Sequence, residues 1–205
     1  LLACGNVVVN ANQLASIYDT ETNKWTKQIA LRQKRVEHDS TMLPDGRVLM
    51  AGGIGKKTIE VVDLKRGVSV QLASEFDGPR DDLSVVTLPD GRVLLMGGQQ
   101  SYTGRTIDEN LVLDLSDPHQ SVMKKIAPMG IKHGVSDLSV VTLGKWIFAL
   151  GGESDLGDHD QELTQARIID GKSLEIWSLP EMIAAHDDAV AAADGRSVFI
   201  IGGYS

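Results

Sequence analysis

The stretch that decides the fold is Leu43-Pro-Asp-Gly-Arg-Val-Leu-Met-Ala-Gly-Gly53, a polar turn followed by a short apolar strand and a glycine pair. It recurs closely at residues 88–98 and more loosely at 143–152 and 193–203. Proline fixes φ at the first turn position and glycine accepts a positive φ, so the stretch predicts a β-hairpin. One hairpin used repeatedly indicates a repeat fold.

A second predicted hairpin follows each of the first three copies, and no segment shows helical periodicity. Four short strands at a period of roughly fifty residues are typical of a propeller blade. We therefore expect one all-β domain over residues 1–205. Its expected parts are a partial blade at 1–29, blades at 38–73, 82–126 and 136–177, and a partial blade at 187–205.

The sequence resembles the kelch repeat along its whole length. The residues that carry the resemblance are the glycine pairs at 52/53, 97/98, 151/152 and 202/203, the Tyr18-Asp19…Thr22…Trp25 spacing, Trp177, and Arg35 with His38. Later units depart from the pattern, because Val62, Leu113 and Ile169 stand where tyrosine is usual. We expect smaller apolar residues to pack those blades.

The resemblance implies a kelch-type β-propeller, a fold that usually closes with six or seven blades. This sequence supplies about four, so we expect further blades outside it. The alternative is a four-bladed ring in which the two partial blades pair with each other.

Composition narrows the classes of partner. The formal net charge of −8 disfavours nucleic acid, whose phosphates need clustered Lys and Arg. No apolar run approaches the roughly 18 residues of a membrane span. Cys4 is the single cysteine, which favours a reducing, cytoplasmic compartment, although a secreted propeller without disulfides would look the same.

Polar residues open the predicted inner strands, which line the central channel of a propeller. Alignment on the hairpins gives a channel-mouth ring of Glu37, Asp82, Asp137 and His186. Two residues further on, and so on the same strand side, stand Asp39, Ser84, Ser139 and Asp188. Such a ring could bind a cation or a partner's Lys or Arg. The competing interpretation is that these groups accept hydrogen bonds from backbone N–H groups, Arg35 and Arg80, and so tie blades together.

The loops after each second strand and the connectors between blades should share one face of the propeller. In proteins with kelch repeats this loop face commonly binds a partner, often through Arg and aromatic residues, so the resemblance implies binding residues here. The candidates are Arg35, Arg80, Tyr102, Arg105, Lys132, His133, Glu153 and Asp155. The competing interpretation is a set of solvated loops with no ligand.

The sequence gives little evidence for phosphate binding, metal binding or the catalytic sites of known propeller enzymes. No helix follows the glycine pairs, so they indicate backbone crowding rather than phosphate binding. The acids of residues 153–162 do not match a twelve-residue calcium loop, and we expect neither a metal site nor a cofactor. The residue patterns of copper radical oxidases and iron-dependent specifier proteins are absent, whereas sialic acid mutarotases, whose sites are less legible, stay possible.

The sequence therefore favours a non-catalytic scaffold that binds a protein or peptide partner on the loop face. The alternative is a propeller enzyme that acts on a sugar or small molecule at the channel mouth.

Overall fold

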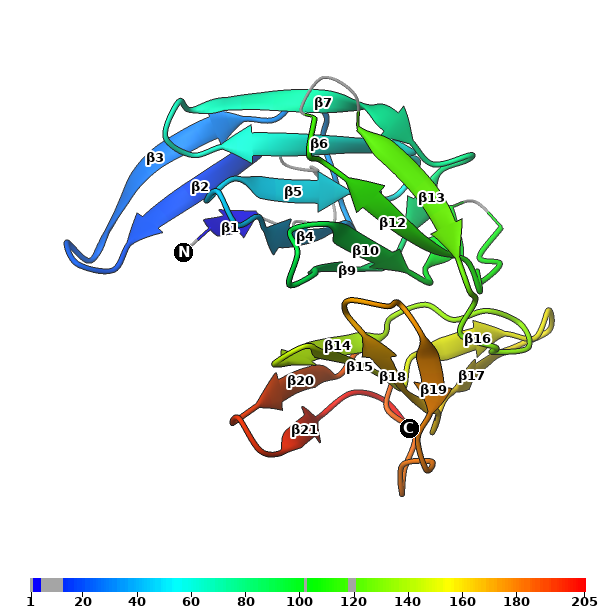
Figure 1. Ribbon diagram of the computed structural model, residues 1–205. Helices are drawn as coiled ribbons and strands as arrows, with labels where there is room; N and C mark the ends of the chain where they lie inside the picture. Colours follow the sequence, from blue (N-terminus) through cyan, green and yellow to red (C-terminus); the bar gives the residue numbers. More distant parts are fainter. Residues whose placement is uncertain (1, 5–12, 102, 118–120) are drawn as a thin grey trace.

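The computed structural model describes residues 2–4, 13–101, 103–117 and 121–205. Three four-stranded antiparallel sheets follow one another along the chain (Figure 1). The first sheet contains β4 (Asp39–Met42), β5 (Val48–Ala51), β6 (Thr58–Asp63) and β7 (Val68–Glu75). The second contains β9 (Ser84–Thr87), β10 (Val93–Met96), β12 (Asn110–Asp114) and β13 (Val122–Ile126). The third contains β14 (Ser139–Leu143), β15 (Trp146–Leu150), β18 (Ala166–Asp170) and β19 (Ile176–Ser178). These are the three predicted blades.

Two smaller sheets flank the blades. One contains β1 (Leu2–Cys4), β2 (Leu14–Asp19) and β3 (Lys24–Ala30), and the other contains β20 (Val190–Ala193) and β21 (Val198–Ile201). The end strands β1 and β21 lie in different sheets, so the described residues form an open arc of blades (Figure 1) rather than a closed four-bladed ring. Among these residues, no helix is long and apolar enough to cross a membrane.

The first strand of each unit lies on the inside of the arc. Contacts join β4 to β9, β9 to β14 and β14 to β20, so the innermost strands stand side by side. The residues just before these strands therefore gather at one end of the channel.

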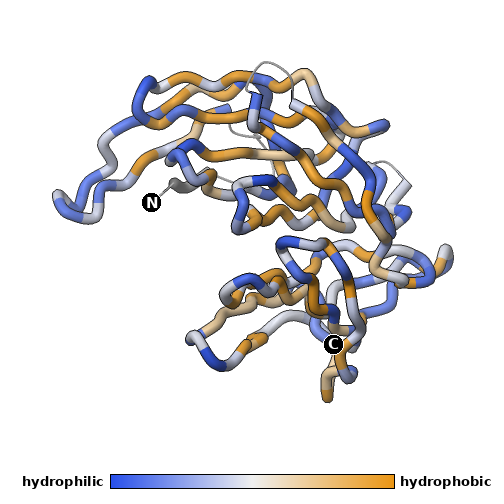
Figure 2. The backbone as a smooth tube through the Cα atoms, viewed as in Figure 1, coloured by the Kyte–Doolittle hydropathy of each residue, from blue (hydrophilic) through white to orange (hydrophobic). Residues whose placement is uncertain are grey.

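The hydrophobic core lies between neighbouring blades. Every residue of β5 and β10 is buried, because each of these strands packs between two sheets. Leu49 and Leu95, from adjacent blades, belong to one apolar cluster. Figure 2 shows hydrophobic residues along the strands and hydrophilic residues at many of the turns. Burying these apolar faces is the main force that holds blade to blade.

Small apolar side chains fill the positions where the repeat pattern would have tyrosine. Val62, Leu113 and Ile169 are each fully buried, with 0% of their surface exposed. The expectation that these blades pack with smaller residues is confirmed.

The glycine pair allows two blades to approach each other closely. A Cβ on Gly52 would lie 2.3 Å from the carbonyl oxygen of Arg80, and Gly52 has a φ of +69°. A side chain is therefore excluded by contact as well as by backbone conformation. The prediction that these glycines serve packing is confirmed at this position.

Two strand pairs were not predicted. β8 (Arg80–Asp81) pairs with β11 (Gln99–Gln100), and β16 (Glu153–Asp155) pairs with β17 (Asp160–Glu162). Both are short and polar and lack the apolar alternation that marks a half-buried strand. The loop expected after the second strand of the third blade is thus partly a hairpin, which holds Glu153 and Asp155 on regular backbone.

Candidate functional site

Four carboxylic acids, one from each of four units, surround the mouth of the channel. A cavity of about 300 Å³ is lined there by Glu37, Asp82, Asp137 and Asp188. All four have a left-handed backbone, with φ between 50° and 55°. This conformation is uncommon for residues other than glycine, and its repetition makes the four positions structurally equivalent.

Backbone hydrogen bonds between blades accompany this conformation. The Asp82 N–H donates to the Glu37 carbonyl at 3.2 Å, and the Asp137 N–H donates to the Asp82 carbonyl at 3.0 Å. The main chain of the ring therefore ties adjacent blades together, while the side chains face the cavity.

The expected place of His186 in the ring is wrong, and Asp188 takes it. Asp39 pairs with Ala51 and Val190 pairs with Ile201, each partner standing just before a glycine pair. Counting back from Val190 gives Asp188 as the equivalent of Glu37 and places His186 level with Arg35. By the same register Val190, not Asp188, matches Asp39.

The error in the sequence alignment arises in the last hairpin. There the Asp194 N–H donates to the Ser197 carbonyl, whereas in the first repeat Leu43 donates to Arg47. The shorter turn shifts the Asp-Gly-Arg residues relative to the strands. The His186 Nδ1 lies 2.8 Å from the Gly202 carbonyl oxygen.

Three of the ring carboxyl groups have raised pKa values. Burial, with added repulsion from Asp82, raises the pKa of Asp137 to about 8. Burial also raises the pKa of Asp82 to about 6, although a hydrogen bond from Gln99 Nε2 at 2.7 Å opposes the shift. The pKa of Glu37 is raised by burial and by the charges of Asp81 and Asp188. In each of these three residues burial disfavours the ionised form, and neighbouring negative charges add to the effect.

Glu153 belongs to this acidic surrounding rather than to the outer loops. Its main chain exchanges hydrogen bonds with Ser136, the residue before Asp137. Burial and then the charge of Asp187 raise the pKa of its carboxyl to about 7.

Asp39 and Ser84, which each stand two residues after a ring member, link neighbouring blades. Asp39 Oδ2 accepts the Val85 N–H at 2.6 Å, and Ser84 Oγ donates to the Leu138 carbonyl at 2.9 Å. The blade-tying interpretation holds for these residues, with backbone groups rather than Arg35 or Arg80 as the partners.

A second cavity, of about 400 Å³, lies on the loop face between the second and third blades. Its lining gathers four of the predicted partner-binding residues: Arg105, Lys132, His133 and Asp155. Thr106 Oγ1 donates to the His133 carbonyl at 2.8 Å and accepts the Asp155 N–H at 3.1 Å. These bonds hold the three segments of this loop-face cleft in one arrangement.

The basic and acidic side chains of the loop-face cleft differ in whether they have hydrogen-bond partners. Within the described ranges, the side chains of Arg105, Lys132 and His133 make no ion pair or hydrogen bond. In contrast, Asp155 Oδ1 accepts the Gly157 N–H at 2.6 Å, and Asp108 Oδ1 accepts the Met129 N–H at 3.1 Å. The charged groups of Arg105 and Lys132 and the ring of His133 are therefore free to meet a ligand, whereas the carboxylates of Asp155 and Asp108 already bond to the backbone.

Arg35 and Arg80 do not lie on the binding surface that the sequence suggested. Both are 2% exposed. Arg35 forms an ion pair with Glu60 at 2.7 Å, and Arg80 donates to the carbonyls of Gly97 and Glu109. The side chains of Arg35 and Arg80 point inward, because buried carbonyl groups accept their hydrogen bonds and, for Arg35, the buried Glu60 carboxylate pairs with the guanidinium group. Tyr102, the remaining candidate, lies outside the described residues.

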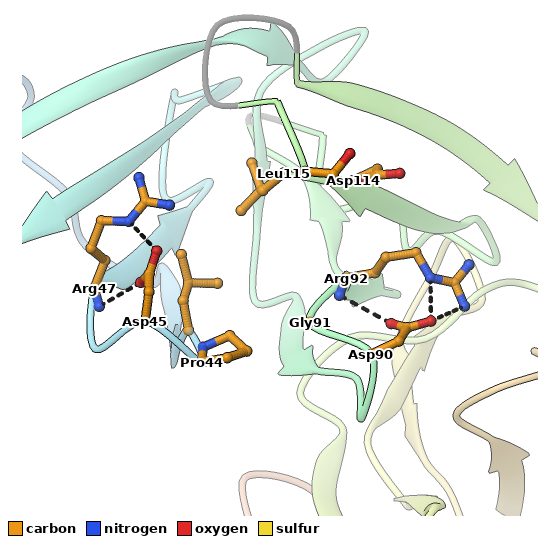
Figure 3. Close-up of a pocket in the computed structure, with 10 residues that line it drawn as sticks. Pro44, Asp45, Arg47, Asp90, Gly91, Arg92, Asp114 and Leu115 are labelled. Carbon is orange, nitrogen blue, oxygen red and sulfur yellow. Dashed lines mark hydrogen bonds and ion pairs between the residues drawn. The ribbon is translucent and has the colours of Figure 1, made fainter.

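A third cavity, of about 240 Å³, lies at the opposite end of the blades between two hairpin turns (Figure 3). Arg47 and Arg92 flank it, and each pairs with an aspartate of its own turn, Asp45 or Asp90, at 2.7 Å. Because these charges are matched within the turns, this cavity offers a ligand less than the loop-face cleft does.

Sequence reasoning missed two residues that shape the site. Glu60 stands among apolar residues of a predicted strand, and that interruption was a usable signal for a buried, paired charge. Gln99, which bonds Asp82, carried no signal because its role depends on the β8–β11 pairing.

No family model and no curated protein matches the sequence significantly. Among solved structures, the chain is similar to one described as the structure of YjhT, with a TM-score of 0.77 and 15% sequence identity. The match covers 93% of this chain and 68% of that chain. YjhT is a kelch-repeat β-propeller protein. At this identity the likeness shows the fold, a kelch-type β-propeller built of four-stranded blades.

Proposed function

We propose that the chain is a non-catalytic binding module that holds a protein or peptide partner on its loop face. The observation that carries this proposal is the loop-face cleft, where Arg105, Lys132 and His133 converge on one cavity without partners of their own. Binding residues concentrate on loops that a rigid scaffold positions, and the Thr106 hydrogen bonds supply that rigidity.

The arrangement also bears on the kind of partner. The cleft presents cationic groups, while the channel mouth on the same face presents carboxyl groups. A partner surface carrying both signs of charge would complement the two cavities. Complementary charge of this kind favours specificity and association rate more than raw affinity.

The test begins with affinity capture of partners from native lysate. Each captured protein is then purified and titrated against the wild type and the Arg105→Glu/Lys132→Glu double variant. A matched control, Lys124→Glu/Lys172→Glu, carries the same charge change at sites outside the cleft. Loss of binding in the cleft variant alone supports the proposal, and equal binding by all three proteins contradicts it.

A second candidate function is an enzyme that acts on a sugar or small molecule at the channel mouth. One observation favours it, because half-buried carboxyls with raised pKa values, such as Asp137 and Glu153, are common where proton transfer occurs. The check is a panel of sugars observed by saturation-transfer NMR with the wild type and Asp137→Asn. Conversion of a sugar by the wild type but not by the variant would favour the enzyme.

A further inference from the structure

Five aspartates of the chain stand directly before a glycine. They are Asp45, Asp77, Asp90, Asp170 and Asp194. An Asp-Gly bond can rearrange without an enzyme, because glycine has no side chain to hinder attack by its own backbone nitrogen on the preceding carboxyl carbon. The fold decides which pairs can react, since the reaction needs both a nitrogen and a carboxyl group that are free to approach each other.

In three of these pairs both reacting groups already have hydrogen-bond partners. The N–H groups of Gly46, Gly91 and Gly171 each donate to a backbone carbonyl oxygen, at 2.9, 2.9 and 2.8 Å. The aspartate before each glycine accepts a hydrogen bond from a basic side chain and at least one more from a backbone N–H group. The nitrogen and the carboxyl group are thus both fixed within the turn.

The Asp194-Gly195 pair has one free group. No described residue accepts the Gly195 N–H. However, Asp194 Oδ1 accepts the N–H groups of Ser197 at 2.7 Å and Arg196 at 3.0 Å. These hydrogen bonds lower the pKa of Asp194. A carboxylate that is ionised and bonded to two N–H groups resists nucleophilic attack, because an oxygen of the carboxyl group must leave.

In the Asp77-Gly78 pair both groups are free. Within the described ranges, the Gly78 N–H has no acceptor and the Asp77 carboxyl group accepts no hydrogen bond. The nearest cation is Lys125 Nζ at 3.7 Å, in a pair whose side chains are 65% and 94% exposed. This lysine lies closer to Glu109, at 2.5 Å. An ion pair so exposed restrains the carboxyl group little.

The Asp77-Gly78 pair lies between β7 and β8, in the connector from the first blade to the second, and both ends of this connector are anchored. The Phe76 N–H donates to the Lys57 carbonyl at 2.8 Å, and the Arg80 N–H donates to the Lys56 carbonyl at 3.0 Å. The buried Arg80 guanidinium group donates to two carbonyl groups of the second blade unit. A change of chain length between the anchors must therefore strain or displace one of them.

We propose that Asp77-Gly78 is a modification site, where the folded chain converts aspartate to isoaspartate without an enzyme. The Gly78 nitrogen loses its proton and forms a bond to Asp77 Cγ, while a carboxyl oxygen leaves as water, which gives a five-membered succinimide. Water then opens this ring. Opening at the main-chain carbonyl of Asp77 gives isoaspartate, in which the chain runs through the former side chain and is longer by one carbon–carbon bond, about 1.5 Å.

The product should loosen the joint between the first two blades. The added length falls between Phe76 and Arg80, so it disturbs the anchors and with them the contacts of Arg80 to the second blade. We expect protein that carries isoaspartate at position 77 to unfold at a lower temperature than fresh protein. The site lies outside the loop-face cleft and does not depend on the partner proposed there.

The test ages the purified protein at neutral pH below its unfolding temperature, in buffer and in concentrated urea. Mass spectrometry with electron-transfer fragmentation then measures isoaspartate at each of the five sites. In buffer it should accumulate severalfold faster at Asp77 than at the other four positions. In urea, where the structural restraints are lost, the other four should approach the rate of Asp77.

Gly78→Ala is the matched variant, because its methyl group hinders the attacking nitrogen. A Cβ at position 78 meets nothing within 4 Å, so the variant should fold like the wild type, as circular dichroism checks. It should form isoaspartate at Asp77 severalfold more slowly. The thermal midpoint should fall on ageing in the wild type and stay constant in Gly78→Ala.

The proposal is overturned if native protein forms no isoaspartate at Asp77 while the urea sample does, or if Asp194 or another site reacts first in buffer. Equal rates in wild type and Gly78→Ala would also overturn it. Equal midpoints of fresh and aged wild type, with isoaspartate present at position 77, would contradict the loosened joint.

Discussion

Arg35 Nε lies 2.7 Å from Glu60 Oε1, and both side chains are completely buried. Arg35 also donates to the carbonyls of Gly52 and Thr58. Glu60 Oε2 accepts the Ser69 hydroxyl and the Arg32 N–H. The charges of both side chains are thus satisfied by polar partners from the first blade and from the connector that leads into it.

Glu60→Ala should lower the free energy of unfolding by about 3–5 kcal/mol, because it leaves the Arg35 charge buried without its partner. Urea denaturation measures the change. Lys57→Ala, which breaks an exposed pair with Glu75, serves as the control and should cost less than about 1 kcal/mol. Similar losses in the two variants would show that burial adds nothing to the Arg35–Glu60 pair.

Gly52→Ala should destabilise the fold more than Gly195→Ala. Both glycines have a positive φ, +69° and +92°, so both substitutions impose a backbone cost. A Cβ at position 195 meets nothing within 4 Å, whereas at position 52 it meets the Arg80 carbonyl. We expect a difference of about 1–3 kcal/mol from this overlap, measured by urea denaturation, and equal losses would contradict the packing role.

Stability should fall as the pH rises from near 4 to about 8. The pKa of Asp137 rises from 3.8 to about 8 in the folded protein, so in this range the native state keeps a proton that the unfolded chain releases. The unfolded state then binds fewer protons, and stability declines with increasing pH. Asp82, with a pKa of about 6, adds to the lower half of the window.

The measurement is the thermal midpoint of wild type and Asp137→Asn between pH 5 and pH 9. The variant should have a flatter profile and a higher midpoint than the wild type at pH 8, because its amide cannot ionise. Parallel profiles for the two proteins would mean that Asp137 titrates normally.

The repeated hairpin was predictable because Pro, Asp and Gly fix a turn locally and the apolar run after them fixes a strand. The channel-mouth ring was predictable in three of its four members. The fourth depended on the length of one turn, and the shared Asp-Gly-Arg residues concealed a shift between the 193–203 copy and the others.

The loop face was harder to predict, because the direction of a long side chain depends on its tertiary surroundings. Arg35 and Arg105 look alike in the sequence, yet one meets a buried carboxylate and the other an open cleft. Only the strand register brings Glu60 to Arg35, and only the packing of neighbouring blades brings Lys132 to Arg105.

The central claim, that partners bind the loop face, is tested most directly by lysine-directed cross-linking of a purified partner complex followed by mass spectrometry. Lys132 lies in the loop-face cleft, whereas Lys65 and Lys172 lie in turns at the opposite end of the blades. We expect cross-links from the partner to Lys132 and none to Lys65 or Lys172. Cross-links to Lys65 and Lys172 without Lys132 would contradict it.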